Sequence, residues 1–576
     1  MVCFEVTFPP VKRYNLNFST TAFLALLFLF FGAFLFYPVS FMLKGAFFAG
    51  GQFSLKYFLL LLESPLERES ILNSFALAFL TTALTTLLAL PLAHWMTRYN
   101  FPGKAWLGGL LLVPMIMPPF VGAIGLSQLL ARFGSLNLFL MRLNVLPPDK
   151  PIDWLGHGGF WGIVILQVMN LYPIMFLNVS AAMANIDPSL RESAQNLGAT
   201  GWRLFRTVTL PLILPGYFAG AAIVFIWAFT DLGTPLIFGF SRVVPVQIFD
   251  AVNELNTNPM GYALVVLVLA LTLTLFLASK RAVAGPRYEM MSRGHTAGAE
   301  ITARPVRAIG IWFVMLAVLG VALMPHLAVI VDSFAKHWFL SVLPRVWTTE
   351  NYAEVFGHGL TASSIRNSLL YSALSALLDL FLGVLIAWLL TRKRIPFAGL
   401  LDALAMLPLA LPGLVLAFGY LAGFDFPVSW LNPRNNPTLL LIISYSVRRL
   451  PYIVRSAYAG FQQTSVTLEE ASANLGATPF RTLRRITLPL VTANLIAGSI
   501  LTFSFAMLEV SDGLILAMRE RFFPITKMIW QVMGRIDPGA PGVACALGVV
   551  GMVLLTISLL VAGKILGGKM GQLFRA

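Results

Sequence analysis

The chain of 576 residues is 58% hydrophobic and only 11% charged, whereas about a quarter of the residues of a soluble globular protein are charged. This composition excludes a soluble protein and predicts a chain that lies in a lipid bilayer. The formal net charge of +15 does not indicate a nucleic-acid partner, because the basic residues are scattered through short segments rather than gathered in one patch.

The first long apolar run covers residues 20–43, a length of 24 residues. At about 1.5 Å per residue, such a helix crosses a hydrocarbon core of about 30 Å with some tilt. The run is too long for a signal peptide and no small-residue cleavage site follows it, so we expect a retained helix. In chain order, twelve spans are predicted: 20–43, 71–96, 105–130, 160–185, 209–232, 259–280, 307–333, 366–391, 398–423, 438–461, 488–515 and 540–566.

Prolines lie inside several of these runs, such as Pro114 and Pro118 in the third and Pro408 and Pro412 in the ninth. Membrane helices tolerate proline where neighbouring helices or water satisfy the freed carbonyl groups. We therefore expect an all-α polytopic membrane protein of about twelve transmembrane helices.

The positions of Lys and Arg favour one orientation. If the N-terminus is cytoplasmic, then Arg98, Lys104, six basic residues in 280–307, the run 392–394 and the basic C-terminal tail all lie inside. This asymmetry predicts that both termini are cytoplasmic, and the same charges attract anionic lipid. The two cysteines imply no disulfide framework, and the six dispersed histidines show no metal-ligand spacing, so no metal site is expected.

An internal repeat divides the chain into two halves. Residues 190–212 align without a gap on residues 468–490, with 13 of 23 positions identical at an offset of 278. Earlier matches, such as Arg98 with Arg392, occur at an offset of 294, so the first half carries 16 extra residues, which we place in the loop around 132–157. We predict two parallel six-helix halves, 1–280 and 307–576, joined by a cytoplasmic linker at 281–306. A secondary transporter of the major facilitator type would share this plan.

Each repeated block lies between the fourth and fifth spans of its half, on the predicted cytoplasmic side. Leu190, Ala194 and Leu197 share one helical face, and Gly198 and its equivalent Gly476 then interrupt the helix. We expect a helix-turn-helix along the membrane surface in each half. The alternative is an ordinary amphipathic anchor helix, which two copies in register make less favourable.

The two blocks carry a shared pattern of glutamate, small residues, glycine and Leu-Pro. It consists of Glu192, Ala194, Gly198 and Pro211 in loop 187–211, and of Glu470, Ala471, Gly476 and Pro489 in loop 465–489. The pattern resembles the EAA loop of binding-protein-dependent ABC importer permeases, with one alanine replaced by serine in each copy. The resemblance implies the type I importer permease fold, with each loop docked on one of two ATPase subunits and with one extracytoplasmic binding protein. It also implies a bacterial inner-membrane location.

The chain itself carries no nucleotide-binding motif. Its one match to phosphate-loop spacing, Gly563 with Gly568 and Lys569, is followed by Met570, where Ser or Thr would hold magnesium, and no strand precedes it. No catalytic constellation is present either. We therefore expect a protein that is not an enzyme and has no cofactor, with ATP and magnesium bound by the partner ATPase.

Charged residues inside the predicted spans are the remaining candidate site. Arg448, Arg449 and Arg455 lie in the tenth span, and Asp231 and Glu509 occupy equivalent positions at the ends of the fifth and eleventh. Such charges face a bundle interior or a cavity. The arginines either meet an anionic substrate or pair with internal carboxylates and carbonyls, and we favour the structural role.

Two further motifs bear on the substrate. Asp231 begins Asp-Leu-Gly-Thr-Pro after the fifth span, and Arg449 begins Arg-Leu-Pro-Tyr in the tenth. With the fused twelve-span plan, these motifs are most similar to the ferric iron permease group, which implies iron transport. Permeases for thiamine, polyamines or aminoethylphosphonate are closely similar alternatives.

Overall fold

The computed structural model describes residues 17–49, 51–254, 259–283, 301–426 and 430–565, and these are almost entirely helical. The predictions for Cys3, for most of linker 281–306 and for the C-terminal tail fall outside this part. The all-α polytopic prediction is confirmed. Among the described residues, ten helices are long and apolar enough to cross a membrane, and a bent pair would be an eleventh. The tenth predicted span, 438–461, forms a 26-residue helix, Thr438–Gln463, whose three arginines set it apart from the apolar helices.

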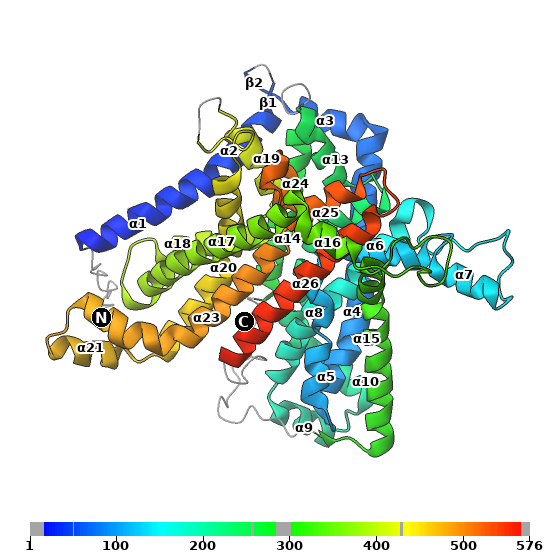
Figure 1. Cartoon of the computed structure of the whole chain (residues 1–576). Helices are drawn as coiled ribbons and strands as arrows, with labels where there is room; N and C mark the ends of the chain where they lie inside the picture. Colours follow the sequence, from blue (N-terminus) through cyan, green and yellow to red (C-terminus); the bar gives the residue numbers. More distant parts are fainter. Residues whose placement is uncertain (1–16, 50, 255–258, 284–300, 427–429, 566–576) are drawn as a thin grey trace.

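The first half holds the elements α1 to α14 (Figure 1). Their bounds are α1 Phe18–Phe31, η1 Gly32–Phe36, α2 Tyr37–Phe47, β1 Phe48–Ala49, β2 Gln52–Phe53, α3 Lys56–Glu63, α4 Pro65–Arg98, β3 Tyr99–Asn100, α5 Lys104–Leu110, η2 Val113–Ile116, α6 Pro119–Leu130, α7 Ser135–Arg142, η3 His157–Gly159, α8 Phe160–Ala184, α9 Pro188–Asn196, α10 Gly201–Leu204, η4 Phe205–Thr209, α11 Leu210–Phe229, α12 Gly233–Phe238, α13 Val244–Ala251, η5 Val252–Glu254 and α14 Met260–Val283.

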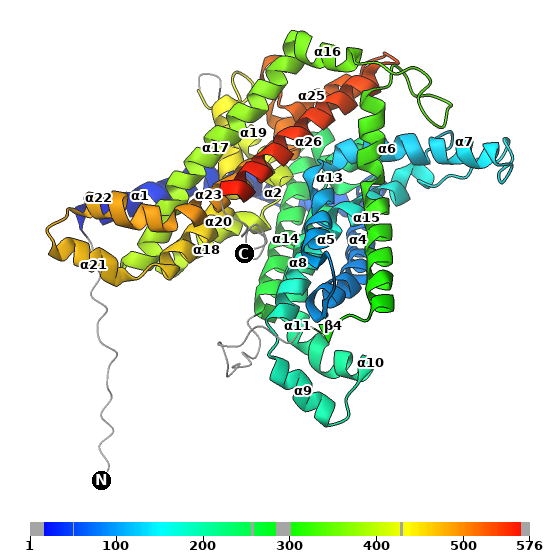
Figure 2. The same cartoon turned by 60° about the horizontal axis from the view of Figure 1, so that its bottom comes forward.

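The second half repeats this order. Its elements are β4 Ile301–Thr302, α15 Pro305–Ser333, α16 Glu350–Gly357, α17 Gly359–Arg392, α18 Ala398–Met406, η6 Leu407–Ala410, α19 Gly413–Gly423, α20 Thr438–Gln463, α21 Val466–Asn474, α22 Pro479–Thr482, η7 Leu483–Thr487, α23 Leu488–Met507, α24 Ser511–Leu516, η8 Glu520–Phe522, α25 Ile525–Met533 and α26 Ala540–Ile565. Helix α7 and its loop lie in the segment 132–157, where the 16 extra residues are predicted, and they project from the bundle in both overall views (Figures 1 and 2).

The third and ninth predicted spans are broken rather than continuous. Met117 and Leu411, which precede Pro118 and Pro412, both have extended backbone, because the proline ring excludes the helical conformation from the residue before it. In the second half the two pieces meet at 102°. The prolines therefore redirect the chain at equivalent points of both halves.

The first helix of each half packs on the other half. In α2, the hydroxyl of Tyr37 donates to the carbonyl of Gly423 in α19, at 2.8 Å. The hydroxyl of Tyr420 in α19 donates in turn to the carbonyl of Phe34, at 2.6 Å. Helix α15 of the second half packs along α6 of the first, where a Cβ on Gly125 would clash with the carbonyl of Pro325. The two halves defined by sequence are therefore interlocked.

The helices form two arms that meet near α6, α13, α19, α24 and α25 and diverge from there. Figures 1 and 2 show α9 and α10 at the end of one arm and α21 and α22 at the end of the other. The two repeated loops thus lie on the same side of the meeting region, well separated from it and from each other.

Candidate functional site

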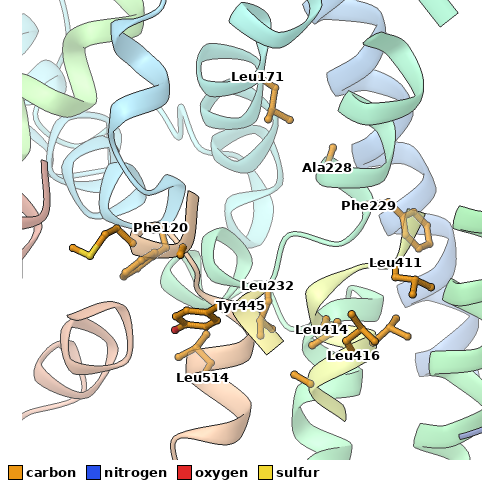
Figure 3. Packing of buried hydrophobic residues seen from close by; sticks show 14 of the residues in the cluster. Phe120, Leu171, Ala228, Phe229, Leu232, Leu411, Leu414, Leu416, Tyr445 and Leu514 are labelled. Carbon is orange, nitrogen blue, oxygen red and sulfur yellow. The ribbon is translucent and has the colours of Figure 1, made fainter. Parts of the chain in front are cut away.

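A cavity of about 210 Å³ lies where the two arms meet. Most of its lining comes in equivalent pairs from the two halves: Met115 and Leu409, Met117 and Leu411, Pro119 and Gly413, Asn170 and Arg448, Leu171 and Arg449, Ile174 and Tyr452, Trp227 and Phe505, Thr230 and Leu508, and Asp231 and Glu509. The breaks before α6 and α19 supply the first three pairs. Figure 3 shows the apolar packing of this region, with Leu171 from α8 and Leu411 from the break before α19.

One wall of the cavity is charged. The guanidinium of Arg448 lies 2.5 Å from Oε1 of Glu509 and 3.3 Å from Oδ2 of Asp512. Arg449 pairs with the other oxygen of Glu509 and donates to the carbonyl of Phe505 at 3.1 Å. All four charged side chains are largely buried. The two arginines therefore pair with internal carboxylates, as the structural alternative predicts, and they also line the cavity.

The break in the ninth span makes room for this wall. A Cβ on Gly413, the first residue of α19, would overlap the guanidinium of Arg448. The equivalent residue of the first half is Pro119, and there Asn170 replaces the arginine. Glycine at the break thus allows the bulky guanidinium to reach Glu509.

The opposite wall is less charged. Asp231 accepts a hydrogen bond from the side-chain amide of Gln167 at 3.2 Å and one from the backbone N–H of Thr234 at 3.3 Å. Asn170 and Leu171 stand where the second half has Arg448 and Arg449. The cavity therefore has pseudo-two-fold shape but an asymmetric charge distribution.

Arg455 does not join this cluster. Its guanidinium lies 3.4 Å from Asp402, and both side chains are about two-fifths exposed at the surface of the protein, at 44% and 38%. Arg455 is two helical turns from Arg448, so a shared face places the two guanidiniums about 10 Å apart along the axis. Of the three arginines, only Arg448 and Arg449 line the cavity.

The two repeated loops have the same backbone. Asp187 and Ser465 cap the N-termini of α9 and α21, and their side chains accept from backbone N–H groups of the first turn. Two residues beyond the ends of these helices lie Gly198 and Gly476, with φ of +84° and +81°. The N–H of Ala199 reaches back five residues to Ala194 at 2.9 Å, which is the hydrogen bond of a helix terminated by glycine in the left-handed region.

The expected second helix of each loop is not separate. Helix α10 continues through the π-helical stretch η4 into α11, and α22 continues likewise through η7 into α23. Pro211 and Pro489 lie two residues after the ends of these π stretches. Since proline has no N–H to donate, a wider turn before it accommodates the missing hydrogen bond. The Leu-Pro pair thus lies within a continuous helix.

Glu192 and Glu470 are exposed on α9 and α21, at the ends of the two arms. Ala194 is half-buried, whereas Ala471 is exposed. The structure therefore presents both glutamates toward the surface of the arms and away from the cavity.

Sequence reasoning missed several polar residues of the spans. Asp512 lies three residues after Glu509 and accepts from Ser444 at 3.0 Å as well as from Arg448. Asp379 in α17 is fully buried and accepts from Ser446 at 2.5 Å. Both carboxylates interrupt predicted apolar spans, and that signal alone marks them as candidates for a functional or structural role. Within the described residues, no three His, Cys, Asp or Glu side chains are grouped to hold a metal ion.

Comparisons with known proteins agree with the repeat. The family model described as "Binding-protein-dependent transport system inner membrane component" matches residues 85–287 and again 379–571. A ferric transport system permease protein, FbpB of Actinobacillus pleuropneumoniae, is 27% identical over 93% of this chain and 76% of its own length. The molybdenum transport system permease protein ModB of Escherichia coli is 26% identical over 37% of this chain and 92% of its own.

A bacterial alginate ABC transporter, solved with a periplasmic protein bound to an alginate pentasaccharide, is similar at 18% identity and a TM-score of 0.37. It covers 45% of this chain and 92% of the matched chain. The two family matches together cover more than half of the chain, one in each half, and each contains one repeated loop. The chain is a multi-pass membrane protein that belongs to the family of inner membrane components of binding-protein-dependent transport systems.

Proposed function

We propose that this permease forms the membrane pathway of an ATP-driven importer and that two ATPase subunits dock on its repeated loops. The observation that carries this proposal is the pair of matched loops at the ends of two arms that diverge from one shared cavity. Glu192 and Glu470 are exposed there, and neither makes an ion pair or a side-chain hydrogen bond within the described chain. Movement of either loop would be transmitted along its arm to the cavity.

ATP hydrolysis then belongs to the partner subunits, and both termini lie on their side of the membrane. An extracytoplasmic binding protein delivers the substrate to the meeting region of the two arms. The cavity alternates its access as the arms close and open, and the interlocked helices α2 and α15 keep the halves together during this movement.

Ferric iron is the substrate that we propose. The ferric permease relative is similar over 93% of this chain, whereas the molybdenum permease is similar over 37%, which is less than one half. Within the described residues, the carboxylates of the cavity region are not grouped to hold a metal ion, so the proposal of iron depends on the similarity to the ferric permease.

The experiment is uptake into proteoliposomes that contain the permease, the ATPase and the binding protein encoded with it. Labelled ferric iron should enter only with ATP and binding protein, and molybdate, thiamine, a polyamine and aminoethylphosphonate should not compete. ATP-dependent uptake of one of these instead would refute iron but retain the importer. Uptake driven by an ion gradient without ATP would refute the importer itself.

Docking is tested separately with Glu192→Lys combined with Glu470→Lys. Because both side chains are exposed and have no described ion pair, the double variant should keep wild-type thermal stability but lose copurified ATPase or uncouple hydrolysis from uptake. Arg142→Glu, an exposed charge change on α7 and outside both loops, is the control. Normal assembly and uptake in the double variant would show that the loops are not the docking surface.

A further inference from the structure

In the second half, a buried ion pair ties the repeated loop to the bundle. Nε of Arg392, the last residue of α17, donates to Oε1 of Glu469 in α21 at 3.0 Å. The same guanidinium donates to the carbonyls of Phe461 and Thr464 at the end of α20, at 3.0 and 2.8 Å. Thr487 also donates to Glu469, at 3.2 Å. The guanidinium of Arg392 thus joins the ends of two helices to the loop.

In the first half, an arginine occupies the position equivalent to Glu469. Arg98 corresponds to Arg392 at the offset of 294, and Arg191 corresponds to Glu469 at the offset of 278. Arg98 is the last residue of α4, and Arg191 lies in α9. Burial and the positive charge of Arg98 together lower the pKa of Arg191. Arg98 and Arg191 thus occupy the positions at which Arg392 and Glu469 are in contact in the second half, but without the acidic partner that the second half provides.

Three buried nitrogens of this pair have no hydrogen-bond partner among the described residues: Nε of Arg98, and Nε and Nη2 of Arg191. Nδ1 of the nearby His94 is also buried without one. A buried charged donor that loses its hydrogen bonds to water is strongly destabilised. The site therefore offers hydrogen-bond donors and positive charge to an anion. In the second half, the carboxylate of Glu469 occupies the equivalent position.

We propose that a phosphate-class oxyanion binds between Arg98 and Arg191 and ties the loop helix α9 to the end of α4. Arginine guanidiniums match phosphate oxygens in charge and in bidentate geometry. Arg98 ends a membrane span, so the site lies at the level of the lipid phosphates. The anion comes from a lipid headgroup or from free phosphate. Occupancy then sets the stiffness of the first loop, whereas the second loop is held permanently by Glu469.

The test uses the full-length protein in two settings. In detergent without added lipid, its melting temperature is measured in inorganic phosphate against chloride at equal ionic strength. In nanodiscs, it is measured in phosphatidylglycerol against phosphatidylcholine. Stabilisation by inorganic phosphate assigns a soluble anion, and stabilisation by phosphatidylglycerol alone assigns a lipid headgroup. Stabilisation in neither setting overturns the proposal.

Variants locate the effect. Arg191→Gln should lower the affinity for the stabilising anion by about tenfold or more, which is the loss expected when charge-assisted hydrogen bonds are removed. Arg191→Glu, which copies the second half, should raise the melting temperature without added anion and abolish the response to it. Arg206→Gln, an exposed arginine on the same arm, is the matched control, and an equal loss there would indicate general surface attraction and refute the site.

The alternative occupant of the site is a carboxylate of this chain itself. Residues 284–300, outside the described part, include Glu289 and Glu300. If the wild type shows no response but the double variant Glu289→Gln with Glu300→Gln binds phosphate, a linker carboxylate already fills the site and the proposal is wrong. If the wild type responds and this double variant responds equally, the external anion is supported.

Discussion

Glu509 is the residue whose loss should most disturb the cavity wall, because its two oxygens pair with two different arginines. Its side chain is 5% exposed, and those of Arg448 and Arg449 are 17% and 12% exposed. Removing one partner of a buried ion pair typically costs about 3–5 kcal/mol, because the other charge is left uncompensated. In Glu509→Gln, Asp512 still faces Arg448 at 3.3 Å, so we expect a loss of about 3 kcal/mol, the lower end of that range.

The assay is denaturation of the purified permease in detergent, followed by intrinsic fluorescence. Asp402→Asn is the matched control, because its partner Arg455 is 44% exposed and a pair of that kind contributes about 0–1 kcal/mol. A double-mutant cycle with Arg449→Ala should show that the second change costs less once Glu509 has been replaced. If Glu509→Gln is as stable as Asp402→Asn, and uptake alone is lost, then the cluster serves substrate binding and the structural reasoning is wrong.

Three other changes test separate features. Gly198→Ala should loosen the first loop and weaken ATPase copurification, since a positive φ costs about 1–2 kcal/mol for a residue with a Cβ. Gly198→Asn should be milder, and equal behaviour of the two would refute the backbone argument. Gly413→Ala should displace Arg448 and reduce uptake while ATPase docking stays normal, whereas Gly399→Ala, whose Cβ meets no atom within 4 Å, should have no effect. Burial lowers the pKa of Lys527, outside the spans, from 10.5 to about 8. The unfolded chain then binds more protons between these values, so the melting temperature should rise with pH from about 8 toward 10.5, and Lys527→Met should reduce that rise.

The sequence predicted the helical class and the duplication because both depend on local and repeated patterns. Apolar runs of membrane length appear without tertiary information, and Gly198 and Gly476 mark the ends of α9 and α21 because their left-handed backbone favours glycine. The difference between the two repeat offsets, 294 and 278, also located the insertion that contains α7. These features need no knowledge of which helices are neighbours.

Other features depend on partners that are distant in sequence. The tolerance of membrane helices for proline led to a prediction of continuous spans, but in the structure the ninth span is broken at 102° before α19, which depends on tertiary packing. Arg448 and Arg455 looked equivalent by helical position, but their distances to Glu509 and Asp402 separate a buried cluster from a surface pair. The packing of α2 and α15 against the opposite half leaves no periodic pattern in the sequence.

The duplicated backbone and the divergent charges together explain how the two halves differ in role. At equivalent positions, the second half carries Arg448 and Arg449 where the first has Asn170 and Leu171, and Glu469 where the first has Arg191. In each case the second half completes its charge balance internally, with Glu509 at the cavity and Arg392 at the loop. The first half leaves Asn170 uncharged and Arg191 without a described partner. A fused chain allows this division, because each position can change in one half without changing in the other. It follows that the chain's own side chains hold the loop of the second arm, whereas the same contact in the first arm depends on the proposed anion.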